Sequence, residues 1–303
     1  GVYDVSKFAD EHPGGPEVLL EWAGKDATFP FRDLPHSDNA ASILAAFRIG
    51  DVCGEEEYED FQDTLQTRLK AGEGALAQHH REKYDIDLSK AIVPQIPKLG
   101  AKYNTWINEA IPGTIILFGP AWMEVFTRTK WWVVPLFWGP VIATLLALRV
   151  VWFGLTPGAV SLFALGVFFW MFFEYSLHRF VYHWVPPPNA VCNILHFLLH
   201  GAHHLIPMDG DRLVAPPLLA IALIIPLFPS MLLTPWPVFT AFWPGFGCGY
   251  MAYDLTHYFI HHTHPTNAWA RTVKSNHMKH HYKDHDKYYG VSTPFFDYVF
   301  GTI

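Results

Sequence analysis

The sequence predicts a mostly α-helical, polytopic membrane protein with four transmembrane helices in two hairpins and a histidine-rich cap, preceded by a small α+β domain. Three observations lead to this fold class. Aromatic residues reach 16% while charged residues are only 16% of the chain, a balance that is unusual for a soluble domain. Two long stretches carry no charge, and ten histidines stand in four tight groups beside them.

The uncharged stretches are long enough for two helices each. The first joins residues 131–148 to residues 150–173, and the second covers residues 213–253. A helix needs about 20 apolar residues to cross the hydrocarbon core, which makes a buried core of a soluble protein a poor alternative. We expect breaks near residues 154–158 and 229–237. The proline-broken half that begins at Leu213 could also dip into the membrane without crossing it.

Charge asymmetry predicts the orientation. The turns at residues 154–158 and 229–244 are uncharged, whereas basic residues occupy the other helix ends. These are Arg128, Lys130, Arg179, Arg212, Arg271, Lys274, Lys279, Lys283 and Lys287. By the positive-inside rule those ends face the cytoplasm, which places the histidine cap and both termini there.

The four histidine groups are His178 and His183; His200, His203 and His204; His257 and His261; and His277, His280 and His281. Residues three and four apart share a helix face, so each H-x-x-H-H group aims its imidazoles at one point. His178 and His183 are five apart, which a straight helix would splay by roughly 140°, so we expect the helix to end or bend there. Together the groups offer ligands for two metal ions, and imidazole suits iron, zinc, copper or nickel.

Other polar residues lie near these groups. Metal-bound imidazoles usually donate their second N–H to an oxygen, and Glu174 and Asp254 lie one turn before His178 and His257. His196, one turn before His200, is a further candidate outer partner. The remaining histidines of the chain's later part and linker are expected at the surface. They are His79, His80, His262, His264 and His285.

The first 60 residues form a separate acidic domain. They hold 14 Asp and Glu against 4 Lys and Arg, in a chain whose net charge is −7. Residues 61–105 are polar and proline-punctuated, as expected for a linker with a helix or two, and residues 106–303 form the membrane domain. The three cysteines are far apart, which gives no indication of cysteine chemistry. Because the sequence starts at Gly1 without Met or a signal segment, we expect a fragment of a longer protein.

The acidic domain resembles cytochrome b5. The resemblance is carried by Val2-Tyr3-Asp4-Val5-Ser6-Lys7-Phe8, His12-Pro13-Gly14-Gly15, His36-Ser37 and Ile49-Gly50-Asp51-Val52. It implies haem b held by His12 and His36 as axial ligands, an arrangement that leaves no open position and favours electron transfer. It also implies a cytochrome b5 reductase as partner for the acidic face. The strands that precede the Val2 segment in that family have no counterpart in this sequence, so we expect an N-terminally incomplete domain.

The order of the histidine groups resembles the membrane fatty acid hydroxylase and sterol desaturase superfamily, whose members are oxygen-dependent di-metal enzymes. Within it, residues 203–209 with 212–214, and residues 289–293 with 296–302, resemble the fatty acid 2-hydroxylase family. The resemblance implies O2, a ceramide or fatty acyl substrate, hydroxylation at carbon 2 and an endoplasmic reticulum membrane. A haem that carries electrons would be idle beside zinc, which has no redox chemistry. We therefore expect two iron ions, although zinc can occupy the same imidazoles in a purified sample.

Two alternatives remain at this stage. A related sterol or other lipid hydroxylase or desaturase would share every metal ligand. A non-enzymatic zinc-binding membrane protein would instead place acidic residues or histidines inside the spans, and the uncharged interiors offer none. In every case the expected partner is a membrane and its lipids, with no nucleic acid.

Overall fold

The computed structural model describes residues 1–9, 12, 19, 22–28, 31, 36, 38–51, 77–111, 113–263, 265 and 267–303. These residues are mostly helical and divide into two compact units, which are described separately. The first comprises residues 1–120, 185–208 and 281–283, and the second comprises residues 121–184, 209–280 and 284–303. The expected boundary at residue 60 lies outside the described residues.

The first hairpin of the second unit consists of α7 (Val133–Phe153) and α8 (Pro157–Ser176). The helices meet at a turn in which Gly154 adopts a φ of 69°, a conformation that favours glycine. Thr156 caps α8 by accepting a hydrogen bond from the Ala159 N–H at 3.2 Å. The break predicted at residues 154–158 is thereby confirmed. In the described part of the chain, two helical stretches are long and apolar enough to cross a membrane, Val133–Phe153 and Pro157–Tyr182.

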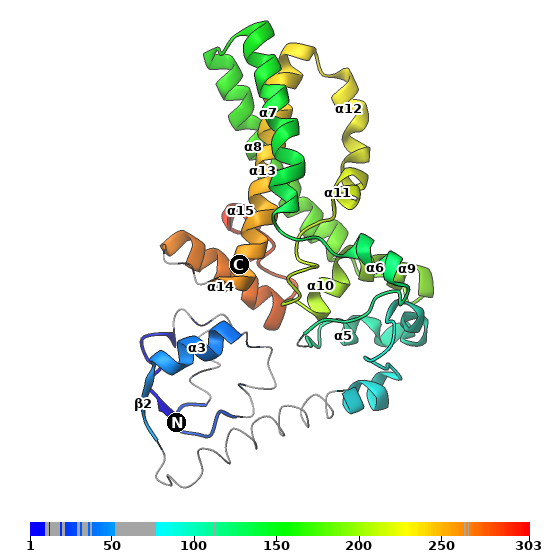
Figure 1. Cartoon of the computed structure of the whole chain (residues 1–303), viewed down its shortest axis with the longest axis vertical. Helices are drawn as coiled ribbons and strands as arrows, with labels where there is room; N and C mark the ends of the chain where they lie inside the picture. Colours follow the sequence, from blue (N-terminus) through cyan, green and yellow to red (C-terminus); the bar gives the residue numbers. More distant parts are fainter. Residues whose placement is uncertain are drawn as a thin grey trace. The chain divides into compact units, whose positions relative to one another are not determined.

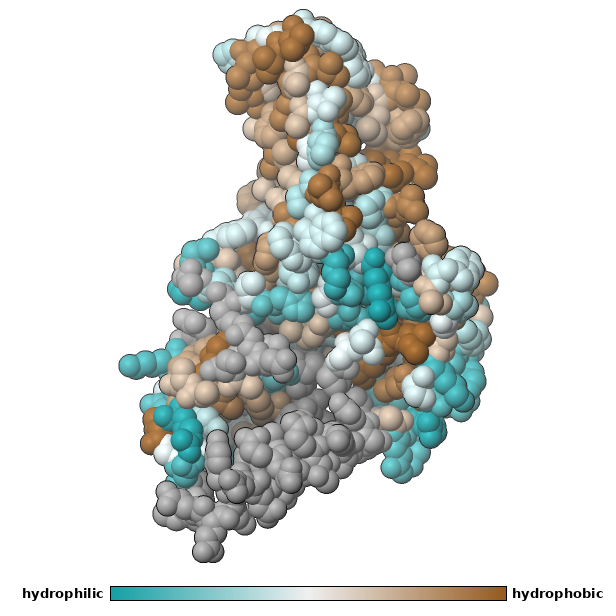
Figure 2. Space-filling view, viewed as in Figure 1, coloured by the Kyte–Doolittle hydropathy of each residue, from teal (hydrophilic) through white to brown (hydrophobic). Residues whose placement is uncertain are grey.

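The second hairpin is less regular. Its first limb contains α11 (Pro217–Ile224), the 3₁₀ turn η8 (Ile225–Leu227) and α12 (Phe228–Leu233). Its second limb is α13 (Trp236–His262), so the break falls within the predicted range. The first limb is short because prolines interrupt it, and α13 is less apolar because its last turns carry Asp254 and three histidines. Figure 2 shows apolar residues on the surface around both hairpins.

Close packing of α8 against α13 brings two histidine-bearing helix ends together. The two helices run parallel, with α7 also packed against α13. A Cβ on Gly245 would stand 2.1 Å from the Phe163 carbonyl oxygen, and one on Gly166 would stand 2.1 Å from the Phe242 carbonyl oxygen. Small residues let membrane helices approach in this way. The carboxyl ends of α8 and α13 therefore lie at the same end of the helix pair.

Shorter elements complete the second unit. They are α6 (Ala121–Glu124), the 3₁₀ turn η5 (Val125–Thr127), the π-helix η6 (Leu177–Tyr182), α14 (Ala268–Tyr282) and α15 (Phe295–Phe300). Helix α14 ends in the first unit, to which His281 and Tyr282 belong.

The first unit begins with an antiparallel pair of strands, β1 (Val2–Tyr3) and β2 (Arg48–Gly50). Helix α3 (Asp38–Ala46) lies just before β2 in the chain. Its apolar core joins residues 84–117 to residues 194–206. The elements around that core are η3 (Val93–Lys98), η4 (Gly100–Lys102), α5 (Tyr103–Trp106), α9 (Ala190–His196), the π-helix η7 (Phe197–Gly201) and α10 (Ala202–Leu205). Residues expected to form the end of a linker are thus folded from residue 77 onward.

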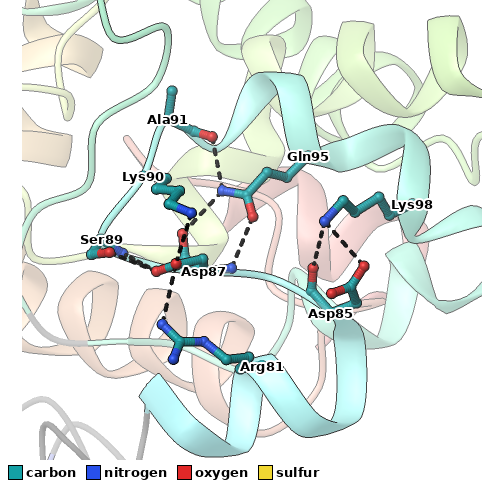
Figure 3. Close-up of polar contacts among 8 residues, drawn as sticks. All are labelled: Arg81, Asp85, Asp87, Ser89, Lys90, Ala91, Gln95 and Lys98. Carbon is teal, nitrogen blue, oxygen red and sulfur yellow. Dashed lines mark hydrogen bonds and ion pairs between the residues drawn. The ribbon is translucent and has the colours of Figure 1, made fainter.

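A polar turn begins this folded segment (Figure 3). Asp87 accepts hydrogen bonds from the Ser89 N–H and hydroxyl, which hold the pKa of its carboxyl well below the usual range, and it pairs with Arg81 at 3.1 Å. The Gln95 amide donates to the backbone oxygens of Asp87 and Ala91. These bonds satisfy the backbone where the helix at residues 77–84 gives way to η3.

Candidate metal centre

Three histidines of the second unit form one group. His178 lies in η6 and His183 directly follows it, while His280 comes from α14. The expected end or bend is a π-helix, in which the His183 N–H donates to the His178 carbonyl five residues earlier at 3.1 Å. This wider turn corrects the roughly 140° splay of a straight helix and leaves the two ring centres 4.9 Å apart. The ligand atoms of all three rings lie within 4.8 Å of one another.

A second group in the same unit joins α13 to α14. His257 and His261 are one turn apart on α13, and His277 faces both from α14. The Nε2 atom of His277 lies 3.0 Å from that of His257 and 2.9 Å from that of His261. All three side chains are buried. The H-x-x-x-H spacing therefore acts as predicted and aims two imidazoles at a third.

The spacing of these nitrogens fits metal binding. Two imidazole nitrogens bound to one metal at about 2.1 Å and at right angles lie roughly 3 Å apart. The His257–His277 and His261–His277 separations have this value, as does the 2.9 Å between the Nε2 atoms of His183 and His280. Burial also lowers the pKa of His280 well below its ordinary value. A neutral imidazole is the form that binds a metal.

The remaining four histidines lie in the first unit. His200 belongs to the π-helix η7, His203 and His204 to α10, and His281 to the end of α14. The ligand atoms of His200 and His204 lie within 4.8 Å of each other, as do those of His203 and His281. All four side chains are buried. The expectation that the H-x-x-H-H motif aims its three imidazoles at one point is therefore wrong, because His203 joins a different group of ligand atoms from His200 and His204.

The outer partners of the histidines are partly backbone groups. His178 donates from Nδ1 to the Tyr289 carbonyl oxygen at 2.6 Å, and His280 donates from Nδ1 to the Lys287 carbonyl oxygen at 2.6 Å. The carboxylate of Glu174 accepts hydrogen bonds from the backbone of Val291 and Ser292. Sequence reasoning missed these carbonyls, because a backbone oxygen has no signature in the residue pattern.

The other candidate outer residues have these partners. Asp254 accepts from the Ala215 N–H and from the Tyr250 hydroxyl, at 3.2 and 3.0 Å. The Nδ1 atom of His196 lies 2.8 Å from the Tyr103 hydroxyl, within the first unit. Roles of Glu174, Asp254 and His196 beside a metal stay predictions.

The histidines outside the groups differ among themselves. His79 is exposed and pairs with Glu109, as expected of a surface residue. The expectation for His80 is wrong, because its side chain is fully buried and accepts a hydrogen bond from the Trp106 indole N–H at 3.0 Å. The apolar core that forms around residues 84–117 encloses it. His262 and His285 are partly buried, and His264 lies outside the described residues.

The two candidate haem ligands face each other. The ring centres of His12 and His36 are 6.3 Å apart, with an angle of 33° between the ring planes. Two metal–nitrogen bonds of about 2 Å, with roughly 1 Å from each nitrogen to its ring centre, span about 6 Å. The pair therefore fits one metal ion held between two imidazoles, the axial arrangement of a haem used for electron transfer.

Known proteins resemble this chain over its entire length. The chain is 33% identical to the fatty acid 2-hydroxylase of Mus musculus over 100% of this chain and 89% of that protein. The chain belongs to the fatty acid 2-hydroxylase family. It is also 34% identical to the ceramide very long chain fatty acid hydroxylase SCS7 of Saccharomyces cerevisiae, over 99% of this chain and 88% of that one.

Family models and a solved structure locate the two parts of this fatty acid 2-hydroxylase family member. The fatty acid hydroxylase model matches residues 163–302, which contain all ten grouped histidines, and the cytochrome b5-like heme/steroid binding domain model matches residues 1–53. A structure of full-length scs7p in which only the hydroxylase domain is visible has 35% identity and a TM-score of 0.70, covering 75% of this chain and 88% of that one. Both resemblances noted in the sequence are confirmed.

Proposed function

We propose that this protein is an oxygen-dependent fatty acid 2-hydroxylase that acts on the acyl chains of ceramide or on their fatty acid precursors. The observation that carries the proposal is the pair of three-histidine groups whose nitrogens have metal-ligand spacing, at the ends of apolar helices. The printed names of the relatives supply the substrate class and the position of hydroxylation.

We assign the ten grouped histidines to two metal ions. Each three-histidine group of the second unit would supply imidazoles for one ion. Two bound iron ions would supply the dioxygen chemistry needed to attack an unactivated C–H bond, which zinc cannot supply. The histidine side chains would bind the ions as neutral imidazoles. The Tyr289 and Lys287 carbonyls fix the ring orientation of His178 and His280.

We propose that electrons reach this centre from the acidic domain formed by residues 1–60. His12 and His36 would hold haem b, and ligation by two imidazoles would suit it to the transfer of single electrons. The excess of acidic residues among positions 1–60 favours docking of a cytochrome b5 reductase, since complementary charge speeds the encounter of electron-transfer partners.

The membrane arrangement follows from the helix ends. We propose that α7, α8, the 217–233 limb and α13 make four spans in an endoplasmic reticulum membrane, with the histidines and both termini on the cytoplasmic side. The uncharged 154–158 turn and the basic residues at the opposite helix ends support this orientation. A lipid substrate can then keep its tail in the hydrocarbon while its head group stays near the histidines.

Product analysis tests the proposed reaction. The chain and its His204→Ala variant are expressed in cells that lack 2-hydroxy acyl lipids, and extracts are examined by mass spectrometry. We expect 2-hydroxy acyl ceramides with the native chain and none with the variant. Hydroxylated sterols or acyl chains modified at another carbon would instead show a related lipid hydroxylase or desaturase. If the expressed chain binds zinc and the cells contain no modified lipid, the result would favour the non-enzymatic alternative.

A further inference from the structure

A short backbone segment near the carboxyl terminus is held by two carboxylates. Glu174 accepts hydrogen bonds from the Val291 and Ser292 N–H groups at 2.9 and 2.6 Å. Asp297 accepts from the two preceding N–H groups, those of Tyr289 and Gly290, at 2.8 Å each. Four consecutive N–H groups are therefore bound by carboxylate oxygens.

This segment and the two residues before it supply the carbonyl oxygens that orient two histidines of the first group. The Lys287 and Tyr289 oxygens accept from His280 and His178, as described above. Tyr288, between them, has a φ of 58°, which is unusual for a residue with a side chain. Such a conformation persists only where surrounding contacts fix it.

A second segment repeats the arrangement beside the other histidine group. Both carboxylate oxygens of Asp254 lie 3.2 Å from the Ala215 N–H. His257, three residues later on α13, hydrogen-bonds the backbone of Leu213. Its Nε2 atom faces His277, so the backbone contact falls to the other ring nitrogen.

The two arrangements share one pattern. A buried carboxylate and a grouped histidine stand three or four residues apart on one helix, where their side chains share a face. The carboxylate accepts from one or more backbone N–H groups of a segment distant in the chain, and the histidine hydrogen-bonds the backbone of the same segment. Glu174 and Asp254 are 4% and 2% exposed, so neither carboxylate is satisfied by solvent.

We propose that Glu174 and Asp254 are positioning residues, each of which fixes the backbone carbonyl that orients one metal-binding histidine. Glu174 acts on His178 through the 289–292 segment, and Asp254 acts on His257 through the 213–215 segment. The inference rests on the proposed metal binding. A carbonyl that holds Nδ1–H keeps Nε2 deprotonated and aimed at the metal, and loss of such partners typically weakens metal binding about 10- to 100-fold.

Metal release into a chelator tests the proposal. The full chain is purified with metal, and release is followed by mass spectrometric metal analysis for the native chain and for Glu174→Ala, Asp254→Ala and the double variant. Glu174→Gln and Asp254→Asn keep an oxygen that can accept the backbone N–H groups. Glu109→Ala is the matched control, because Glu109 also binds three donors, those of Lys83, Tyr84 and His79, and none of these belongs to a grouped histidine or to a segment that binds one.

We expect two slowly released ions in the native chain and in the control. Each single alanine variant should release one ion about 10- to 100-fold faster while retaining the other, the double variant should release both, and the amide variants should hold both ions. Alanine variants that release both ions at the native rate would overturn the inference, as would loss of both ions in each single variant. A native chain that binds fewer than two ions would instead contradict the proposed function itself.

Discussion

His257 and His277 face each other with their Nε2 atoms 3.0 Å apart, although 20 positions separate them in the chain. Both side chains are buried, so water cannot replace either partner. Two buried imidazoles with converging nitrogens are accounted for by a shared metal ion better than by packing alone, because burial of polar rings is costly without partners.

Replacement of His36 should separate the two cofactors. We expect His36→Ala to abolish the haem absorption bands while both metal ions at the grouped histidines remain. The reason is that His36 contacts His12 and Phe31 and belongs to the acidic domain. Absorption spectra and metal analysis of the same sample measure both outcomes. Loss of the ions together with haem would argue against two independent modules.

Buried His80 should make the protein sensitive to mild acid. Desolvation by burial lowers the pKa of His80 to about 4, against 6.5 in the unfolded chain. The unfolded state therefore binds the proton first, so the stability contributed by neutral His80 is complete above pH 6.5 and is lost as the pH falls toward 4. The thermal unfolding midpoint should fall over this range, and less steeply in His80→Gln. If the unfolding midpoint depends on pH equally in the native protein and in His80→Gln, the stability change does not come from His80.

The contact between α8 and α13 should not tolerate a methyl group at Gly245. An alanine Cβ would meet the Phe163 carbonyl oxygen at 2.1 Å, and backbone cannot move aside without separating the helices. We expect Gly245→Ala to lower the free energy of unfolding by about 1–3 kcal/mol or more, as overpacking does. Gly158→Ala is the control, because its nearest atom would be 4.0 Å away. Equal unfolding midpoints in detergent would disprove the close approach.

Arg212 should be more important for stability than its neighbour Lys130. Arg212 is 5% exposed and binds the carboxylates of Glu124 and Asp209, which are also largely buried. Arg212→Met leaves two uncompensated buried charges, which costs about 3–5 kcal/mol. Lys130 is 61% exposed and pairs with Asp211, so Lys130→Met should change the stability little. Denaturant unfolding of both variants measures the difference.

The sequence predicted features that repeat at short spacing. The 154–158 turn and the break before Trp236 follow from uncharged runs and proline positions, and the pairing of His257 with His261 follows from helical periodicity. The division of each H-x-x-H-H motif between two groups of ligand atoms does not follow from the spacing. The π-helix at residues 177–182 was not predictable from the five-residue spacing, because a π-helix and a helix end both relieve the same splay.

Contacts between distant segments were also beyond the sequence. The Tyr289 carbonyl that binds His178 lies 111 positions away, and backbone oxygens are alike in every residue. His80 looked like a surface residue beside His79, but the core formed by distant apolar residues encloses it. Tertiary packing, rather than local pattern, decided both.

Metal analysis of the purified chain tests the central claim most directly. We predict two metal ions per native chain, with loss of metal and of turnover in His204→Ala and His281→Ala, and retention of both ions and most activity in His264→Ala, which stands outside the four groups. A native chain without bound metal, or equal loss in all three variants, would contradict the assignment of the ten histidines to a two-metal centre.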